Sequence, residues 1–358
     1  MLGAALYFWV TSLSGLKTFN LAPSGYYGLL TAGFRGGHLY AAITPEPALL
    51  ALKDPYDPVA NAPYRVHDMV LWRGHYYLYH GVTPVMVFFW PLAAVTGRYP
   101  SEPFAVAVFC SVGLFAAVVL LAAVHRRYFP SAPPWSLALG AACLAFASPC
   151  ADLACGPQFY EVPIACAVCL EMLMFGAVFL ALRAERPSLG WLAAASLAFG
   201  LSLGARPDYV FGGLGLALPC VWMARRRGGG RAWLSALVGA FGPAAACGMA
   251  LLAYNEARFG SPTEFGMHYQ LAGAEFVQQR LLGPESFWAN LRQYLFQPGI
   301  WSRYFPFFSP PGSRAFGIAR CLPWCWLGLL ALAGASRSKQ FGCRIMVGTL
   351  AVCAVANL

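Results

Sequence analysis

Long apolar runs separated by short charged connections dominate the sequence. Nearly uncharged runs extend over 1–13, 104–124, 135–151, 162–182, 190–205, 208–224, 232–253, 315–335 and 345–358. A hydrocarbon core about 30 Å thick needs about 20 helical residues, and the runs that begin at 104, 162, 232 and 315 reach that length. Only helices or closed barrels satisfy every backbone group in lipid, so the pattern predicts an all-α polytopic membrane protein with about nine transmembrane helices.

The two ends of the chain bear on its completeness. The first apolar run lacks a small-residue cleavage site and a basic segment before it, which favours a retained helix over a removable signal peptide. The last run stops at Leu358 inside an apparent helix, which leaves open whether the C-terminus is truncated. We expect a single integral membrane domain over 1–358.

Charge is unevenly distributed between the connections. Four of them are basic: HRR at 125–127, RAER at 183–186, RRRGGGR at 225–231 and RSKQFGCR at 337–344. They hold eleven of the 24 Lys and Arg residues and one acid, Glu185. The positive-inside rule places all four in the cytoplasm. The net charge of +10 therefore reflects membrane topology rather than a nucleic-acid partner.

One apolar stretch, at 82–95, does not fit this alternation. It is short and contains Pro84 and Pro91, and such a run is more often interfacial or re-entrant than spanning. We expect a helix lying on or dipping into the membrane. Two large external loops result, at 14–103 and 254–314.

Two aspartates in the first loop, Asp54 and Asp57, are each followed by proline. The proline biases the residue before it away from α conformation, so both carboxylates lie on a stiff turn. Carboxylate oxygens suit Mg²⁺ or Mn²⁺, and the pair is a candidate for such a cation site or for a general base with its helper. The alternative, which the sequence slightly favours, is an Asx-type turn that leads into the interfacial helix.

A cluster of aromatic, His and acidic residues follows in the same loop. Tyr and Trp at this density are typical of a membrane-water interface. Anchoring does not explain His67, Asp68, Arg73 and His75, which lie among them. Asp68 is the strongest candidate for a general base, and the three basic residues are candidates for binding substrate.

Further cations follow two later apolar runs. Arg206, in GARPDYV, has a guanidinium suited to phosphate, and a local pair with Asp208 is the alternative. Arg258 and His268 lie in the stretch 254–270, where they could contact a substrate headgroup. The alternative is an ordinary turn at 260–262 with Arg258 paired to Glu256.

Glu171 lies near the middle of an apolar run. An ionised carboxylate there costs about 2.5–3.5 kcal/mol on insertion scales. We expect a protonated side chain bonded to a neighbouring helix. A single such acid also argues against an ion-coupled transporter, which usually needs several polar groups in the membrane.

Several stretches resemble one known family. YYLYHGVTPVMVFFWPLAAVTG, at 76–97, is similar to the juxtamembrane segment of the GT-C membrane glycosyltransferases of the protein O-mannosyltransferase and aminoarabinose transferase type. FAVAVFCSVGLFAAVVLLAAVHRRYFP, at 104–130, is similar to their second spanning helix and its cytoplasmic end. DPYDP, HDMVLWRGHYYLYHG and YNEARFGSPTEFG resemble stretches of bacterial multipass proteins described as glycosyltransferases.

The resemblance implies a GT-C-like fold in the inner (cytoplasmic) membrane with an extracytoplasmic active site. It implies a polyprenyl-phosphate sugar donor that enters from the bilayer, inverting transfer, and an Asp or Glu of the first external loop as base. The family acid lies soon after the first helix, where this chain reads NLAPSGYYGLL without a carboxylate and Ser24 stands near its place. Either the base has moved to Asp54, Asp57 or Asp68, or the chain does not catalyse.

The predicted function is a membrane glycosyltransferase acting on an envelope acceptor, which is a glycan, lipid or protein. A lipid-linked sugar phosphate needs a base for the acceptor, a cation for the departing phosphate and a membrane-level groove. The helix at 82–95 is expected to wall that groove. The alternative is a non-catalytic multipass protein, either a lipid-binding envelope partner or a transporter.

Overall fold

The structure is a computed structural model, and it describes only part of the chain. The described residues are 2–13, 17–79, 81–183, 188–273, 284–303, 308–309, 317–321, 326, 330, 333–334 and 341–356. The chain divides into two compact units, called unit 1 (Met1–Val210 and Cys220–Gln279) and unit 2 (Phe211–Pro219 and Arg280–Leu358). That these form one domain stays a prediction.

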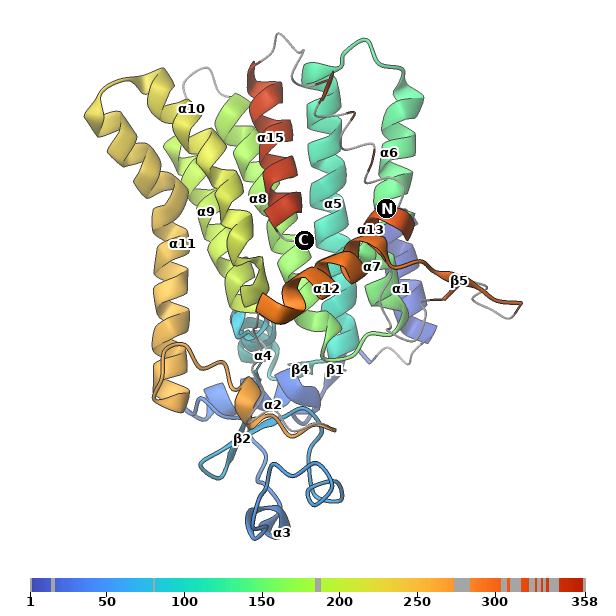
Figure 1. Ribbon diagram of the computed structural model, residues 1–358, viewed down its shortest axis with the longest axis vertical. Coiled ribbons are helices and arrows are strands. Elements are labelled where there is room, and N and C mark those ends of the chain that lie inside the picture. Colours follow the sequence, from blue (N-terminus) through green and yellow to red (C-terminus); the bar gives the residue numbers. More distant parts are fainter. Residues whose placement is uncertain are drawn as a thin grey trace. The chain divides into compact units, whose positions relative to one another are not determined.

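The described chain is mostly helical, as predicted (Figure 1). Its helices up to residue 259 are α1 (Leu2–Leu13), α2 (Gly25–Arg35), α3 (Pro47–Leu50), η1 (Val85–Phe89), α4 (Trp90–Thr96), α5 (Glu102–Tyr128), α6 (Pro134–Phe146), α7 (Pro149–Cys155), α8 (Glu161–Arg183), α9 (Leu189–Ala205), η2 (Pro207–Leu216), α10 (Ala217–Arg227) and α11 (Gly230–Phe259). Beyond them come η3 (Met267–Tyr269), α12 (Pro284–Phe296), α13 (Ile318–Cys321) and α15 (Phe341–Ala356). Three antiparallel pairs of short strands complete it: β1 (Phe19–Asn20) with β4 (Tyr99–Pro100), β2 (Val70–Trp72) with β3 (His75–Tyr77), and β5 (Ile300–Trp301) with β6 (Phe308–Ser309).

Three of the described helices, α5, α8 and α11, are long and apolar enough to cross a membrane. Shorter apolar helices occupy four more of the predicted runs, as α1, α6, α9 and part of α15. The run predicted at 208–224 forms η2 and most of α10, and the run at 315–335 lies mostly outside the described residues. Membrane association is therefore supported, and the count of nine spans stays a prediction.

In unit 1, α8 packs between α5 and α9, and α9 packs in turn against α11. Small residues make these contacts close. Gly113 of α5 lies against the backbone of Cys169, and Gly200 of α9 lies against Ala244 and Cys247 of α11. Small residues at helix interfaces are the usual means of tight packing in lipid, where no hydrophobic effect drives helices together.

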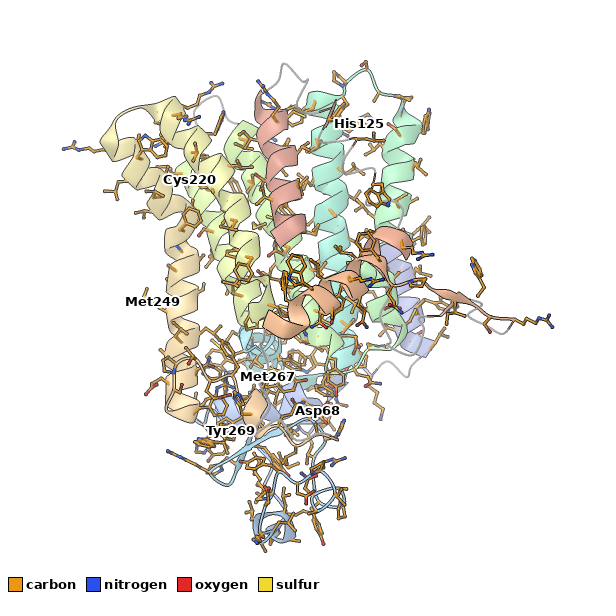
Figure 2. All side chains as sticks on the ribbon, in the orientation of Figure 1. Asp68, His125, Cys220, Met249, Met267 and Tyr269 are labelled. Atoms are coloured by element: carbon orange, nitrogen blue, oxygen red, sulfur yellow. The ribbon has the colours of Figure 1, made fainter. Side chains whose placement is uncertain are left out.

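The two ends of unit 1 differ in character. The basic residues that end α5 and α10 follow His125 and Cys220, and these two residues lie toward one end, whereas Asp68 and Tyr269 lie at the other (Figure 2). This separation matches the sorting of charge that the sequence predicts. Which end faces the cytoplasm stays a prediction.

The stretch 82–95 forms a helix too short to span a bilayer. It begins as η1, continues as α4 and ends at Gly97, whose φ of 68° is in the left-handed region that glycine adopts easily. Both segments pack against α2 in the first loop. The predicted short helix is therefore confirmed, and its position at a membrane surface remains a prediction.

Glu171 of α8 is buried, and its Oε1 accepts a hydrogen bond from Ser202 Oγ of α9 at 2.9 Å. The predicted bond to a neighbouring helix is confirmed.

Candidate functional site

A tight hairpin organises the first loop around the candidate residues. Strands β2 and β3 pair with Trp72 opposite His75, so only Arg73 and Gly74 form the turn. Their φ angles are 48° and 78°. Two positive φ angles in a two-residue connection are typical of a type I′ turn, whose twist matches that of the strands. Arg73 thus has a structural role in this turn, with its guanidinium over the Trp72 ring.

The segment after α11 adds to this hairpin. Val70 forms an isolated β-bridge with Gln270. The N–H of Asp68 donates to the carbonyl of Leu271 at 2.8 Å, and the N–H of Leu271 donates to the carbonyl of Met69 at 2.8 Å. The rings of Trp72 and Tyr269 lie 4.2 Å apart between centroids. Backbone pairing therefore brings the two large loops together at the position of Asp68.

Asp68 is a buried carboxylate, with 8% of its surface exposed. Its backbone has a φ of 58°, a region that Asp and Asn tolerate better than other non-glycine residues. Oδ1 accepts a hydrogen bond from Gln270 Nε2 at 2.8 Å, and Oδ2 lies 3.5 Å from His67 Nε2. One oxygen is therefore fixed by an amide and the other faces an exposed histidine.

Tyr79 links Asp68 to Arg206. Its hydroxyl is hydrogen-bonded to the side chain of Gln270. The pKa of Tyr79 is raised to about 12, mainly by burial; the negative charge of Asp68 contributes to the rise, and the positive charge of Arg206 opposes it. Carboxylate and guanidinium therefore act on the same hydroxyl. We call Asp68, Tyr79, Arg206 and Gln270 the Asp68 site.

Arg206 follows the last residue of α9 and is already paired. Its Nη2 lies 2.6 Å from Oδ2 of Asp208, and Nε donates to the same oxygen at 3.1 Å. The local pair weighed as an alternative is thus present. The guanidinium remains about one-third exposed, so it is partly accessible to a ligand.

A second carboxylate, Glu102, acts on the same tyrosine as Asp68, namely Tyr26. Burial raises the pKa of Tyr26, and the charges of Asp68 and Glu102 raise it further, so both acids are close to this ring. Tyr26 donates to the carbonyl of His67 at 2.6 Å. Glu102, the first residue of α5, accepts the N–H of Tyr27 at 3.1 Å and so caps the first turn of α2, where Ser24 makes no side-chain cap. A carboxylate from α5 thus reaches the stretch NLAPSGYYGLL, which has none of its own.

Unit 1 contains an apolar cavity of about 570 Å³, which we call the lateral cavity. Its walls come from α2, the segment 82–90, α9 and α11, and include Thr83, Trp90, Gly204 and Tyr254. Gly204 lies two residues before Arg206, and Thr83 lies four residues after Tyr79. The lateral cavity and the Asp68 site therefore share two stretches of chain.

Asp54 and Asp57 form turns rather than a site with Asp68. Asp54 Oδ1 accepts the N–H of Tyr56 at 2.9 Å, and Asp57 Oδ1 accepts the N–H of Val59 at 2.8 Å. These are Asx-type turns. No group of three or more His, Cys, Asp or Glu side chains that could hold a metal occurs in the described residues. The donor set therefore does not support the cation site considered for this pair.

The remaining predicted residues are dispersed. The His75 ring stacks on Tyr40 with centroids 4.0 Å apart. His268 Nδ1 lies 2.8 Å from Glu264 Oε2, a pairing that was not predicted. Contacts of either histidine with Asp68 do not occur among the interactions described.

Arg258 is buried and serves the packing of α11. Its Nη1 donates to the carbonyl of Leu78 at 2.8 Å, and Nη2 donates to Asn255 Oδ1 at 2.6 Å. The guanidinium carbon lies 4.1 Å from the centroid of the Tyr254 ring. These contacts tie the first loop to α11 and leave Arg258 little access to substrate.

Gln270 and Glu102 were missed by sequence reasoning. Gln270 is 202 positions from Asp68 and carries no local signal. Glu102 did carry a local signal, because an acid directly after Ser101 and before Pro103 is typical of the first turn of a helix.

Comparison with known protein families, with characterised proteins and with solved structures finds no match to this chain. The similarity to GT-C enzymes therefore stays a prediction from the sequence.

Proposed function

We propose that the chain is a membrane glycosyltransferase of the GT-C type, which transfers a sugar from a polyprenyl phosphate to an envelope acceptor. One observation carries the proposal. The charges of a buried carboxylate, Asp68, and a partly exposed guanidinium, Arg206, both act on Tyr79, and Thr83, four residues further along the chain, lines the apolar lateral cavity. These are the three components that such a reaction needs.

Asp68 acts as the general base in this proposal. Its Oδ2, which is not bonded to Gln270, accepts the proton of the acceptor hydroxyl. The acceptor oxygen then forms a bond to the anomeric carbon while the bond from that carbon to the phosphate oxygen breaks. The configuration at the anomeric carbon is therefore inverted. A positioned base contributes about 10² to 10⁴ in rate.

Arg206 offsets the negative charge that develops on the departing phosphate. A guanidinium is suited to phosphate oxygens because it donates two parallel hydrogen bonds. Phosphate binding would compete with the present pair to Asp208. The lateral cavity binds the first isoprene units of the donor. The proposed chemical steps are carried out by the side chains of Asp68 and Arg206.

A non-catalytic lipid-binding role is the second candidate. The ion pair between Arg206 and Asp208 supports this role, because a guanidinium that is neutralised by a carboxylate has less charge to offer a phosphate. In that case the lateral cavity binds a lipid chain and no sugar is transferred.

The test measures transfer of labelled sugar from polyprenyl phosphate in membranes. Asp68→Asn should lower the rate by about 10²-fold or more, because Asn cannot accept the proton. Asn tolerates the φ of 58° and its carbonyl can still accept from Gln270, so the fold is preserved.

The matched control is the pair Asp54→Asn with Asp57→Asn, which should transfer sugar near the wild-type rate. Undiminished transfer by Asp68→Asn would sink the assignment of the base. If the wild-type chain transfers no sugar but still binds polyprenyl phosphate, the non-catalytic role is favoured.

A further inference from the structure

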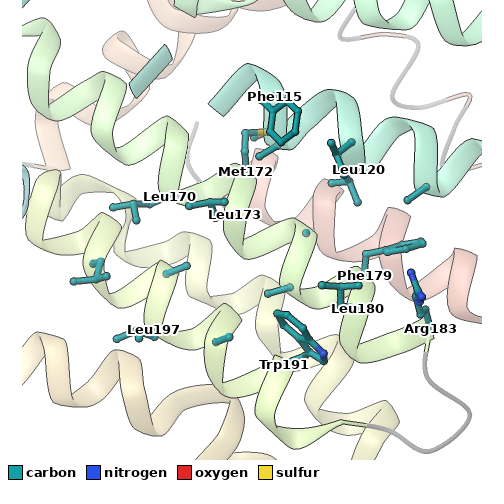
Figure 3. A pocket seen from close by; sticks show the side chains of 18 residues that line it. Phe115, Leu120, Leu170, Met172, Leu173, Phe179, Leu180, Arg183, Trp191 and Leu197 are labelled. Atoms are coloured by element: carbon teal, nitrogen blue, oxygen red, sulfur yellow. The ribbon is translucent and has the colours of Figure 1, made fainter. Parts of the chain in front are cut away.

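A long apolar groove lies on unit 1 between α5, α8 and α9, apart from the Asp68 site (Figure 3). It has a volume of about 580 Å³. Small residues, among them Ala116, Gly176 and Ala198, form part of its lining, and larger side chains such as Phe115 and Leu180 stand beside them. We call it the Arg183 groove, after the charged residue at one end.

The length of the Arg183 groove matches one leaflet of a bilayer. Its lining on α8 extends from Leu170 to Arg183, which at 1.5 Å per residue is roughly 20 Å. On α9 it extends from Trp191 to Leu201, or roughly 15 Å. Half of a hydrocarbon core about 30 Å thick is about 15 Å. A groove of this length could hold one acyl chain of a single leaflet.

The polar groups of the groove are confined to one end. Arg183 and Trp191 lie there, with Leu170 and Leu197 at the opposite end (Figure 3). Arg183 is exposed and is the one charged side chain among the described residues that line the groove. Trp is enriched at the headgroup level, where its N–H stays hydrated.

We propose that the Arg183 groove binds an anionic phospholipid, with one acyl chain along α8 and the phosphate paired with Arg183. Basic residues between helices at the membrane surface bind anionic headgroups in this way. The apolar lining excludes a polar ligand, and Arg183, the one charged side chain among the described lining residues, favours a negatively charged headgroup. The proposal does not depend on the proposed transferase activity.

The experiment uses the full chain in phosphatidylcholine nanodiscs that contain a phosphatidylglycerol with a diazirine in its acyl chain. After illumination, mass spectrometry should locate the label on α8 and α9 residues that line the groove. Unlabelled phosphatidylglycerol should compete about fivefold better than phosphatidylcholine, as expected for one basic residue near the headgroups. Arg183→Gln should remove this preference.

Gly176→Leu tests the groove itself. A Cβ at Gly176 meets no atom within 4 Å, so leucine should fill the groove without displacing the helices, and labelling should fall. Gly248→Leu is the matched control, because Gly248 of α11 also faces open space and does not line the groove. Should Gly176→Leu fail to fold, as judged by its melting temperature, Gly176→Ala gives a smaller filling.

Three results would overturn the proposal. The first is equal competition by the two lipids in the wild-type chain, which would indicate ordinary surrounding lipid. The second is labelling that is the same in Gly176→Leu and Gly248→Leu. The third is the absence of lipid label from the α8 and α9 residues that line the groove, which would show that lipid does not enter it.

Discussion

Tyr56 ties the turn formed by Asp54 and Asp57 to strand β2. Its hydroxyl donates to the carbonyl of Leu71 at 2.8 Å. The pKa of Tyr56 is raised to about 12, mainly by burial, with smaller contributions from Tyr269 and Asp54. A raised tyrosine pKa stabilises the fold fully below pH 10, the ordinary value, and this contribution is lost as the pH rises toward 12.

Tyr56→Phe should therefore change stability in a pH-dependent way. At pH 8 the variant should have a free energy of unfolding about 1 kcal/mol lower, because it lacks the hydrogen bond. The wild-type chain should then lose up to about 3 kcal/mol between pH 10 and 12, since each pKa unit corresponds to about 1.4 kcal/mol. The difference in the free energy of unfolding between the wild-type chain and Tyr56→Phe should therefore shrink as the pH rises and then change sign. Denaturant unfolding in detergent, followed by Trp fluorescence, measures it, and a constant difference across this range would contradict the assignment.

Asp68 was singled out as a candidate from the sequence because an interfacial aromatic cluster does not need an acid, and its role as a base stays a prediction. The residues that contact Asp68 could not be identified in this way. Gln270 reaches Asp68 through backbone pairing of two distant loops, and nothing in its own neighbourhood indicates this contact. Arg258 looked like a phosphate ligand because sequence gives its charge but not its burial, and the structure places its guanidinium against the Tyr254 ring.

Between elements, one close contact holds the Asp68 site to the helix bundle. Gly81 and Thr83 both lie against Gly204, near the end of α9. A Cβ at Gly81 would overlap the carbonyl oxygen of Gly204, and a Cβ at Gly204 would overlap Thr83 Oγ1. Glycine at both positions thus permits the approach that brings Tyr79 near Arg206.

Gly81→Ala should lower the free energy of unfolding by about 1–3 kcal/mol, as overpacking usually does. It should also lower sugar transfer, because the added methyl displaces the segment that carries Tyr79. Thermal unfolding and the transfer assay measure the two effects. Gly248→Ala is the control and should leave both unchanged, since its Cβ meets open space. If the two variants behave alike, the close contact does not position the site.

The elements themselves were predictable to different degrees. Apolar runs located α5, α8 and α11 because a long uncharged stretch has few alternatives to a helix. The hairpin β2–β3 was not predicted. Its turn is Arg-Gly, a weaker signal than the Asn-Gly or Asp-Gly usual in two-residue connections, and its aromatic residues are equally typical of an interface.

For the whole molecule, the orientation in the membrane is the broadest prediction. The charged ends of unit 1 are separated, with His125 near one end and Asp68 at the other (Figure 2). If the basic end faces the cytoplasm, the Asp68 site faces outward. The side chain of Val59 is 82% exposed in the first loop, and Gly229 is an exposed residue between α10 and α11.

Cysteine introduced at Val59 should react with a membrane-impermeant thiol reagent in intact cells. Cysteine introduced at Gly229 should react only after lysis. The chain has twelve cysteines of its own, of which Cys143 and Cys155 are exposed among the described ones, so unaltered cells provide the background. The reverse labelling pattern would place Asp68 and Arg206 in the cytoplasm. A donor and acceptor would then have to reach the Asp68 site from that side, and the proposed transfer outside the membrane would be wrong whatever the effect of Asp68→Asn.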